Sequence, residues 1–133
     1  MADTAATELI HAQVPLCATL GITADTFRPD EVVLSLDWAP NLCTGNDVLH
    51  GGIVMALADS AGGVCAFLNL PAGAAGTATI ESKTNFIAAT RSGTVKAHCH
   101  PLHIGKRVIV LETEVRGDDG KLTAKVLQSQ AIL

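Results

Sequence analysis

The stretch from His50 to Asn69, HGGIVMALADSAGGVCAFLN, decides the fold. Its small and apolar side chains follow a glycine pair and end before Leu70-Pro71. Because proline cannot continue a helix, we expect a long buried helix from Gly51 to about Asn69. Asp59 interrupts the apolar run, and a membrane span needs roughly 20 predominantly apolar residues, so the pattern argues against one.

Short runs of alternating residues surround this helix on both sides. Before it, residues 9–20 predict one short helix, and residues 22–28 and 31–36 predict a hairpin. After it, strands are expected at residues 77–88, 93–100, 107–116 and 121–133, with a hairpin turn at 117–120. One buried helix against an antiparallel sheet is an α+β arrangement, and a sheet that curls round the helix would cover its apolar faces.

Composition limits the classes of function. The 133 residues, 48% hydrophobic and 17% charged, predict a single folded domain over 1–133, with a loose N-terminus at 1–8. The formal net charge of -4 argues against broad binding to nucleic acid or to an anionic membrane. The N-terminus has no secretory pattern and the four cysteines are scattered, so we expect reduced thiols and a cytoplasmic protein.

Asp59 is the most informative residue, because it is the only acidic or basic side chain between His50 and Glu81. A carboxylate among alanine and leucine residues is unfavourable unless it has a partner. Proteins keep such groups mainly where chemistry or a fixed structural bond requires them. Asp59 is therefore a candidate catalytic carboxylate, and the alternative is a structural acid at a subunit contact.

The glycine pair at the helix start predicts a second part of a site. Free N–H groups at a helix N-terminus suit an oxygen that gains negative charge, and glycine lets a ligand approach closely. Gly52 lies seven positions before Asp59, about 10 Å along the axis, which is too far for both to hold one reacting carbon. A shared site therefore requires two subunits. His50, directly before the glycines, is a candidate for positioning a ligand.

The segment from Leu49 to Asp59 resembles the signature of the hotdog-fold, phenylacetyl-CoA thioesterase-like family of the phenylacetate pathway. In that family a His-Gly-Gly triplet opens the central helix, and an acid follows seven residues after the second glycine. Weaker similarity continues from Gly21 to the C-terminus. The resemblance implies a hotdog fold, in which a curved antiparallel sheet wraps a long central helix.

The resemblance also implies an activity, the hydrolysis of an aryl- or medium-chain acyl-CoA to free acid and CoA. Asp59 would be the nucleophile or the general base, and the Gly52 N–H would polarise the carbonyl. His50 would help to place the thioester, and Thr79 would orient the water. The family implies no metal or organic cofactor, and an active dimer that is often part of a homotetramer.

One position departs from the family pattern. Many relatives carry Asn six residues before the histidine, where this chain has Thr44, and Asn46 nearby is a candidate substitute. The departure concerns the positioning of substrate rather than the type of reaction.

A basic cluster is predicted to bind the phosphates of CoA, because Lys, Arg and neighbouring N–H groups suit phosphate. The alternative is an ordinary charged turn. The residues assigned to this cluster are Arg91, Gly105, Lys106 and Arg107. The residues expected to line the acyl pocket are Ala56, Gly63, Val64 and Ile80.

Other functions fit the sequence less well. His98, His100 and His103 have a metal-like spacing, but Pro101 is expected to break the strand before His103, so we predict no metal site. A hydratase or dehydratase of the same fold would pair a histidine base with the acid in a different order. A non-catalytic acyl-CoA binding module would usually lack the acid and carry an added DNA-binding segment.

Overall fold

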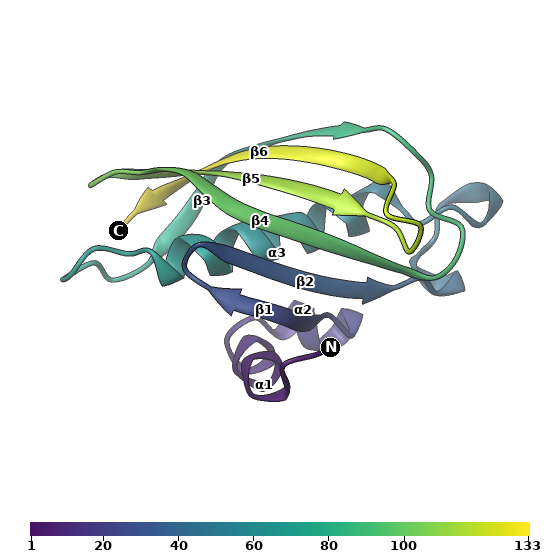
Figure 1. Ribbon diagram of the computed structural model, residues 1–133, viewed down its shortest axis with the longest axis horizontal. Coiled ribbons are helices and arrows are strands. Elements are labelled where there is room, and N and C mark those ends of the chain that lie inside the picture. The colour runs from purple at the N-terminus through teal and green to yellow at the C-terminus, as the bar shows by residue number, and fades with distance from the viewer.

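The computed structural model describes residues Met1 to Leu133. Six antiparallel strands form one sheet in the order β1-β2-β4-β5-β6-β3, and this sheet curves around the long central helix α3 (Figure 1). The predicted α+β hotdog architecture is confirmed. In chain order the elements are α1 (Thr4–Gln13), α2 (Pro15–Leu20), β1 (Thr23–Arg28), β2 (Glu31–Asp37), the 3-10 turns η1 (Pro40–Leu42) and η2 (Gly45–Asp47), α3 (Gly51–Leu68), β3 (Thr77–Phe86), β4 (Thr94–Ile104), β5 (Val108–Arg116) and β6 (Leu122–Ile132).

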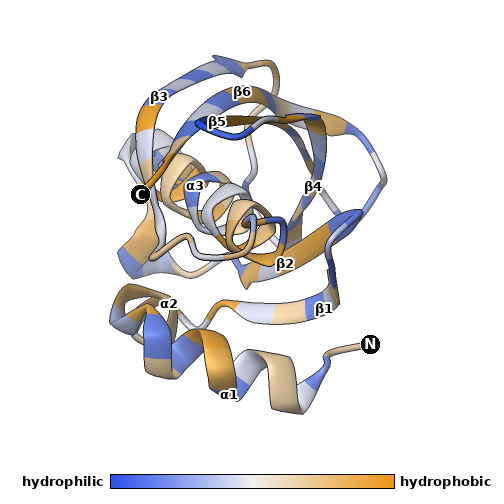
Figure 2. Ribbon diagram, turned by 90° about the vertical axis from the view of Figure 1, so that its left-hand side faces the viewer, coloured by the Kyte–Doolittle hydropathy of each residue, from blue (hydrophilic) through white to orange (hydrophobic).

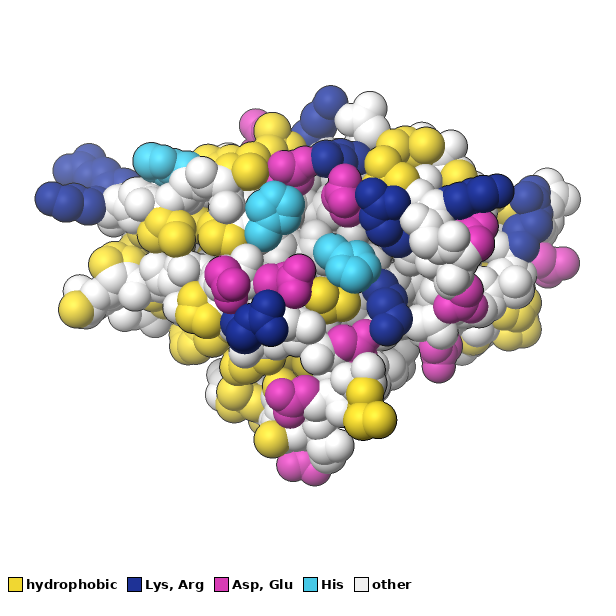
Figure 3. All heavy atoms as spheres, in the orientation of Figure 1, with side chains coloured by type: hydrophobic (Ala, Val, Ile, Leu, Met, Phe, Trp, Pro, Cys, Tyr) yellow, Lys and Arg dark blue, Asp and Glu magenta, His cyan; other side chains and the backbone are white.

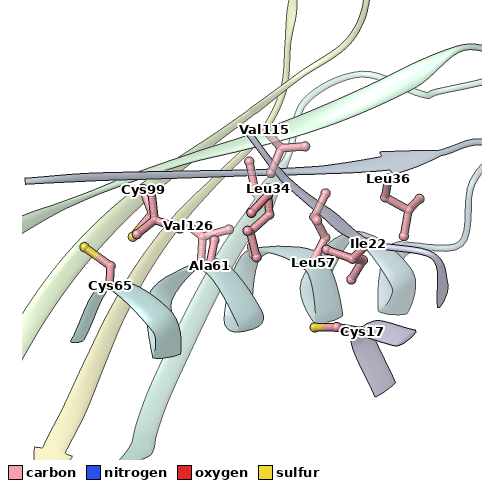
Figure 4. Close-up of a cluster of buried hydrophobic side chains, with 14 of the residues drawn as sticks. Cys17, Ile22, Leu34, Leu36, Leu57, Ala61, Cys65, Cys99, Val115 and Val126 are labelled. Atoms are coloured by element: carbon pink, nitrogen blue, oxygen red, sulfur yellow. The ribbon is translucent and has the colours of Figure 1, made fainter. Parts of the chain in front are cut away.

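The central helix buries one stripe of small and apolar side chains against the sheet. These residues recur every three or four positions, which keeps them on one helical face. They are Val54, Leu57, Ala58, Ala61, Gly62, Cys65 and Ala66. Alanine and glycine bring the helix close to the strands, as Figure 4 shows for Ala61 beside Val126. Although α3 is long and apolar enough to cross a membrane, the sheet wraps it as a core helix (Figure 2).

The strands alternate between inward and outward side chains, as a sheet with one covered face requires. In β4 the buried residues are Val95, Ala97 and Cys99, which alternate along the strand and share its inward face. In β6 the inward series begins with Ala124 and Val126 and continues into two glutamines. β3, by contrast, is an edge strand, and all of its residues are exposed or half-buried.

The N-terminus is ordered, so the prediction of a loose segment at 1–8 is wrong. Asp3 caps α1 by accepting a hydrogen bond from the Ala6 N–H at 3.0 Å, and Ala6 is buried. The Ala24 N–H of β1 donates to Thr7 Oγ1 at 2.9 Å, which ties α1 to the sheet. The single helix predicted for residues 9–20 is two helices, because Pro15 starts a new one at its first position.

The expected break at Pro101 is also absent. β4 continues through Pro101 to Ile104, and the pairing with β5 shifts its register between Pro101 and His103. A local irregularity of this kind accommodates a residue that has no N–H to donate.

All four cysteines are free thiols, as the sequence predicted. Cys17, Cys65 and Cys99 are buried. A hydrogen bond with Cys99 and burial both raise the pKa of the Cys65 thiol, so this group stays protonated at neutral pH.

Candidate active site

Asp59 projects from the middle of α3 towards β3. The Thr79 hydroxyl donates to Asp59 Oδ1 at 2.8 Å, and the Gln128 amide donates to the same oxygen at 2.5 Å. Asp59 Oδ2 accepts no hydrogen bond within the chain and is free to contact a substrate or a water. The sequence predicted a carboxylate surrounded by apolar groups, but in a single chain Asp59 is exposed.

Two buried glutamines of β6 complete this hydrogen-bond network. The Gln130 amide donates to Thr79 Oγ1 at 2.6 Å, and the Thr77 hydroxyl donates to Gln130 Oε1 at 2.7 Å. Gln128 and Gln130 are each 1% exposed. Sequence reasoning missed both residues, although they extend the inward alternation of Ala124 and Val126 and were therefore polar groups placed on a core face.

A cavity of about 520 Å³ opens beside Asp59. Helix α1 forms one wall with Leu9 and Ile10, and α3 forms another with Val64 and Phe67. Most of the polar groups in its lining belong to the hydrogen-bond network of the carboxylate. The polar lining residues are Asp59, Ser60, Thr77, Thr79 and Gln130, with Gln13 on the α1 side.

The lining agrees only partly with the acyl pocket predicted from the sequence. Gly63 and Val64 line this cavity, whereas Ala56 and Ile80 do not. Ile80 is 62% exposed on the edge strand, and the N-terminal helices supply apolar residues that the sequence did not indicate.

At the start of α3 the backbone amides of Gly52 and Ile53 already have partners within the chain. The Gly52 N–H donates to His50 Nδ1 at 2.8 Å, so the His50 ring caps the helix. The next amide, Ile53 N–H, donates to the His50 carbonyl at 2.9 Å. Because His50 is exposed, its ring has room to turn away and release the Gly52 N–H.

A second cavity, of about 380 Å³, lies at this end of α3. Its lining includes Gly51, Thr44 and Phe86, and the Phe86 ring lies directly over Gly51, where an added Cβ would come within 3.1 Å of it. Thr44, the position that departs from the family pattern, therefore faces the start of the helix. Asn46 does not line this cavity and has a left-handed backbone, with a φ of 61°.

The predicted basic cluster does not form within one chain. Arg91 precedes β4, while Gly105, Lys106 and Arg107 form the turn after it. The ten residue steps of that strand span about 33 Å at the usual rise. Arg91 follows Thr90, which lines the cavity at the start of α3, whereas the Arg107 carbonyl accepts from the Ile132 N–H near the C-terminus.

The three histidines do not converge on one point. His100 lies 3.7 Å from Glu112, whose other oxygen pairs with Lys125, and no three His, Cys, Asp or Glu side chains gather as a ligand set. Figure 3 shows a mixed surface of acidic, basic and histidine side chains on one face of the molecule. Pairing with Arg116 and with Lys125 lowers the pKa of Glu114.

Comparison with known proteins shows which proteins this chain is similar to. Residues 46–124 match the thioesterase superfamily. A Saccharolobus solfataricus protein designated as an esterase is 35% identical over 86% of this chain and 80% of its own. The 1,4-dihydroxy-2-naphthoyl-CoA hydrolase of Escherichia coli is 34% identical over 65% of this chain and 62% of its own. A Pseudomonas aeruginosa thioesterase structure is 25% identical, with a TM-score of 0.88 over 96% of this chain and 93% of its own.

Proposed function

We propose a specific hydrolase function from one premise: this chain belongs to the thioesterase superfamily. Membership and the named relatives support hydrolysis of a thioester in general terms. The proposal is that the substrate is an acyl-CoA and that Asp59 is the catalytic carboxylate. The single observation that carries it is the free Oδ2 of Asp59 at an apolar cavity, with Oδ1 held by two donors.

In the proposed reaction, Asp59 Oδ2 takes a proton from a water as the water oxygen attacks the thioester carbon. The alternative is direct attack by Oδ2, which forms an anhydride that water then hydrolyses. In both cases the carbon–sulfur bond breaks, and the sulfur leaves as the thiolate of CoA and takes up a proton. A carboxylate and an N–H donor at a helix start suffice for this, because a thioester is already activated.

Thr79 has a different proposed role from the one that the sequence indicated. Its hydroxyl proton is directed at Asp59 Oδ1, and its oxygen accepts from Gln130. We therefore assign Thr79 to holding the carboxylate rather than to donating a hydrogen bond to the attacking water. The Gly52 N–H remains the proposed donor to the carbonyl oxygen, once substrate displaces the His50 ring from it, and the displaced ring then contacts the thioester.

The proposed active unit is a homodimer, assembled through β3 and the adjacent face of α3, and we expect it within a tetramer. Gly52 and Asp59 are about 10 Å apart along their own helix, so each site needs Gly52 of one chain and Asp59 of another. The exposed apolar side chains on this side support the proposal, because a partner would cover them. They include Met55, Phe67, Ile80, Phe86 and Ile87.

The phosphates of CoA are proposed to bind the basic residues at the two ends of β4. Arg91 follows directly on the cavity at the start of α3, and the Gly105-Lys106-Arg107 turn lies at the opposite end of the same strand. Because about 33 Å of strand separates them, one bound nucleotide would contact these residues only if they came from different subunits.

The acyl group is proposed to be aryl or medium-chain, as in the phenylacetyl-CoA thioesterase-like family. The apolar cavity beside Asp59, with Phe27 and Phe67 in its lining, supports this choice. The naphthoyl-CoA substrate in the name of the Escherichia coli relative supports an aryl group in particular.

The test is to measure thiol release from a panel of aryl- and aliphatic-acyl-CoAs, with the Asp59→Asn variant as the inactive control. We expect wild-type hydrolysis of at least one thioester, and the ranking across the panel names the acyl class. Addition of water to an enoyl-CoA without thiol release would replace the proposal with a hydratase. Binding of acyl-CoA without any turnover would replace it with a non-catalytic binding module.

A further inference from the structure

Gln128 differs from the other side chains near Asp59 because it reaches the carboxylate from inside the core. It extends from β6 and is 1% exposed, yet its amide donates to Asp59 Oδ1 at 2.5 Å. Thr79 donates to the same oxygen from β3. Two donors from different strands fix both the position and the rotation of the carboxylate, and they leave Oδ2 as its only unoccupied oxygen.

Packing alone does not explain a glutamine at this position. Its carbonyl oxygen, Oε1, is buried and has no hydrogen-bond partner, although buried polar atoms are normally paired. A methionine would fill the same space without that unpaired oxygen. Gln128 leaves one polar atom unpaired, while its amide nitrogen holds the Asp59 carboxylate. The presence of a glutamine here is therefore better explained by its contact with the carboxylate than by the needs of the fold.

The helix also provides space for this amide. A Cβ built on Gly62 would lie 1.8 Å from Gln128 Oε1 and 2.6 Å from its Cδ. Gly62 is buried on the face of α3 that meets the sheet. Any larger residue at position 62 would push the amide away, so the absence of a side chain there allows Gln128 to reach Asp59.

Gln130 acts one step further away. Its amide donates to Thr79 Oγ1, and a hydroxyl that accepts from one side directs its own proton to another acceptor, here Asp59. Thr77 in turn holds Gln130 through its Oε1. The network therefore runs in one direction, from Thr77 through Gln130 and Thr79 to the carboxylate.

We infer that Gln128 is a positioning residue for thioester hydrolysis, holding Asp59 Oδ1 so that Oδ2 faces the substrate cavity, with Gln130 supporting Thr79 in the same task. This inference rests on the proposed function, since it assigns Gln128 a role in catalysis by Asp59. It adds two buried residues of β6, Gln128 and Gln130, to the residues assigned to the reaction.

The test compares steady-state hydrolysis by wild type, Gln128→Met and Asp59→Asn on the best acyl-CoA. Gln128→Met should lower kcat by roughly 10- to 100-fold, because a misplaced catalytic group costs up to about that much. KM should stay within about twofold, and the melting temperature should not fall, because the unpaired Oε1 is removed. Ser129→Ala, at the outward-facing neighbour on β6, is the matched control and should keep the wild-type kcat.

Gly62→Ala is the second variant, because it displaces the Gln128 amide while leaving Gln128 in place. It should give the same loss in kcat at nearly constant KM. If Gln128→Met does not fold, Gly62→Ala alone tests whether Gln128 positions Asp59. A wild-type kcat in a folded Gln128→Met or Gly62→Ala protein overturns the inference, even when Asp59→Asn is inactive. A wild-type kcat in Asp59→Asn instead overturns the proposed function itself.

Discussion

At the scale of single residues, the two oxygens of Asp59 have different surroundings. Oδ1 accepts from Thr79 and Gln128, whereas Oδ2 accepts nothing within the chain. A carboxylate held through one oxygen keeps the other at a fixed place, and positioned groups of this kind supply much of the rate enhancement in enzymes. The asymmetry explains how a side chain that is exposed in one chain can still be preorganised.

Thr79→Val tests the donor that holds the carboxylate from β3. Valine keeps the shape of threonine but cannot donate to Asp59 or accept from Gln130, so kcat should fall by roughly 10- to 100-fold with little change in KM. Thr79→Ser retains the hydroxyl and should stay within about threefold of wild type. Steady-state kinetics on one acyl-CoA provides the measurement, and a Thr79→Val enzyme with normal kcat would contradict the assigned role.

The sequence indicates part of this network and misses the rest for a physical reason. Asp59 stands out because no other charge lies near it in the chain, and Gly51-Gly52 stands out because it opens an apolar helix. Gln128 and Gln130 do not stand out, because glutamine on a terminal strand usually faces water. The alternation with Ala124 and Val126 places them on the inward face, but only the contact of β6 with β3 and α3 shows that they meet Thr79 and Asp59 there.

At the scale of elements, α3 contains two adjacent glycines in unlike surroundings. Gly62 faces the sheet against Gln128, whereas nothing lies within 4 Å of a Cβ built on Gly63. In an open helical position, alanine is favoured over glycine by about 0.5–1 kcal/mol. Alanine substitutions at positions 62 and 63 therefore form a matched pair: both gain the same helix propensity, but only the one at position 62 disturbs packing against the sheet.

We predict that Gly63→Ala raises the free energy of unfolding by about 0.5–1 kcal/mol, since only backbone entropy changes. Gly62→Ala has the same intrinsic advantage but displaces the Gln128 amide and loses its hydrogen bond, so it should be less stable than Gly63→Ala by about 1–2 kcal/mol. Urea denaturation of the two variants provides the comparison. Equal stabilisation by both would show that Gln128 does not pack tightly against the helix.

Asp25 connects β1, β2 and β4 on the outer face of the sheet. Its carboxylate accepts from Lys96 Nζ at 2.8 Å and from Ser35 Oγ at 2.6 Å. Burial acts to raise the pKa of Asp25, but the bonds with Lys96 and Ser35 outweigh it and hold the pKa below the ordinary value of 3.8. The ionised Asp25 therefore stabilises the folded state fully above about pH 4. This stabilisation is lost as the pH falls through the lowered pKa of Asp25 in the folded state.

Asp25→Asn should accordingly lower the free energy of unfolding by about 1 kcal/mol at pH 7. The difference from wild type should shrink as pH falls below about 4, where the wild-type carboxylate becomes protonated. Asp30→Asn is the control, because Asp30 pairs with Arg28 at the surface with 78% of its side chain exposed, and exposed pairs contribute little. If the difference in unfolding free energy between wild type and Asp25→Asn stayed constant down to about pH 2, the stabilising role assigned to the ionised Asp25 would be contradicted.

The elements also show which structural features the sequence could predict. The central helix and the final four strands follow from apolar periodicity and from turn residues, and all are present. The first part of the N-terminal helix was missed. Asp3 caps it locally through the Ala6 N–H, but what ties the helix to the sheet is the bond from the Ala24 N–H of β1 to Thr7, which depends on the fold. The continuation of β4 through Pro101 depends likewise on its pairing with β5.

At the scale of the whole molecule, β3 and the adjacent face of α3 remain uncovered. Asp59 and Thr79 lie within this exposed region, together with Ile80, which is 62% exposed. The other edge of the sheet, β1, is packed against α1. A second copy placed against β3 would shield the carboxylate from water and bring another helix start towards it, which is the arrangement that the proposed dimer requires.

Ile80→Lys tests this assembly. A lysine at the centre of the proposed interface would be unpaired when buried, so the dimer should dissociate to a species of 13.7 kDa and hydrolysis should be lost. Leu102→Lys, at a comparably exposed position on β4, lies away from β3 and should change neither property. Light scattering after gel filtration gives the mass, and an Ile80→Lys protein with wild-type mass and activity would contradict the proposed interface.

The most direct test of the central claim is the kcat of Asp59→Asn relative to wild type on the best acyl-CoA. Asparagine keeps the shape of the side chain and one oxygen that can accept from Thr79 and Gln128, so the fold and substrate binding should persist. Without the carboxylate, kcat should fall by about 10²–10⁴-fold at an unchanged melting temperature. A folded Asp59→Asn protein with kcat within about threefold of wild type would contradict catalysis by Asp59 and leave it a structural acid.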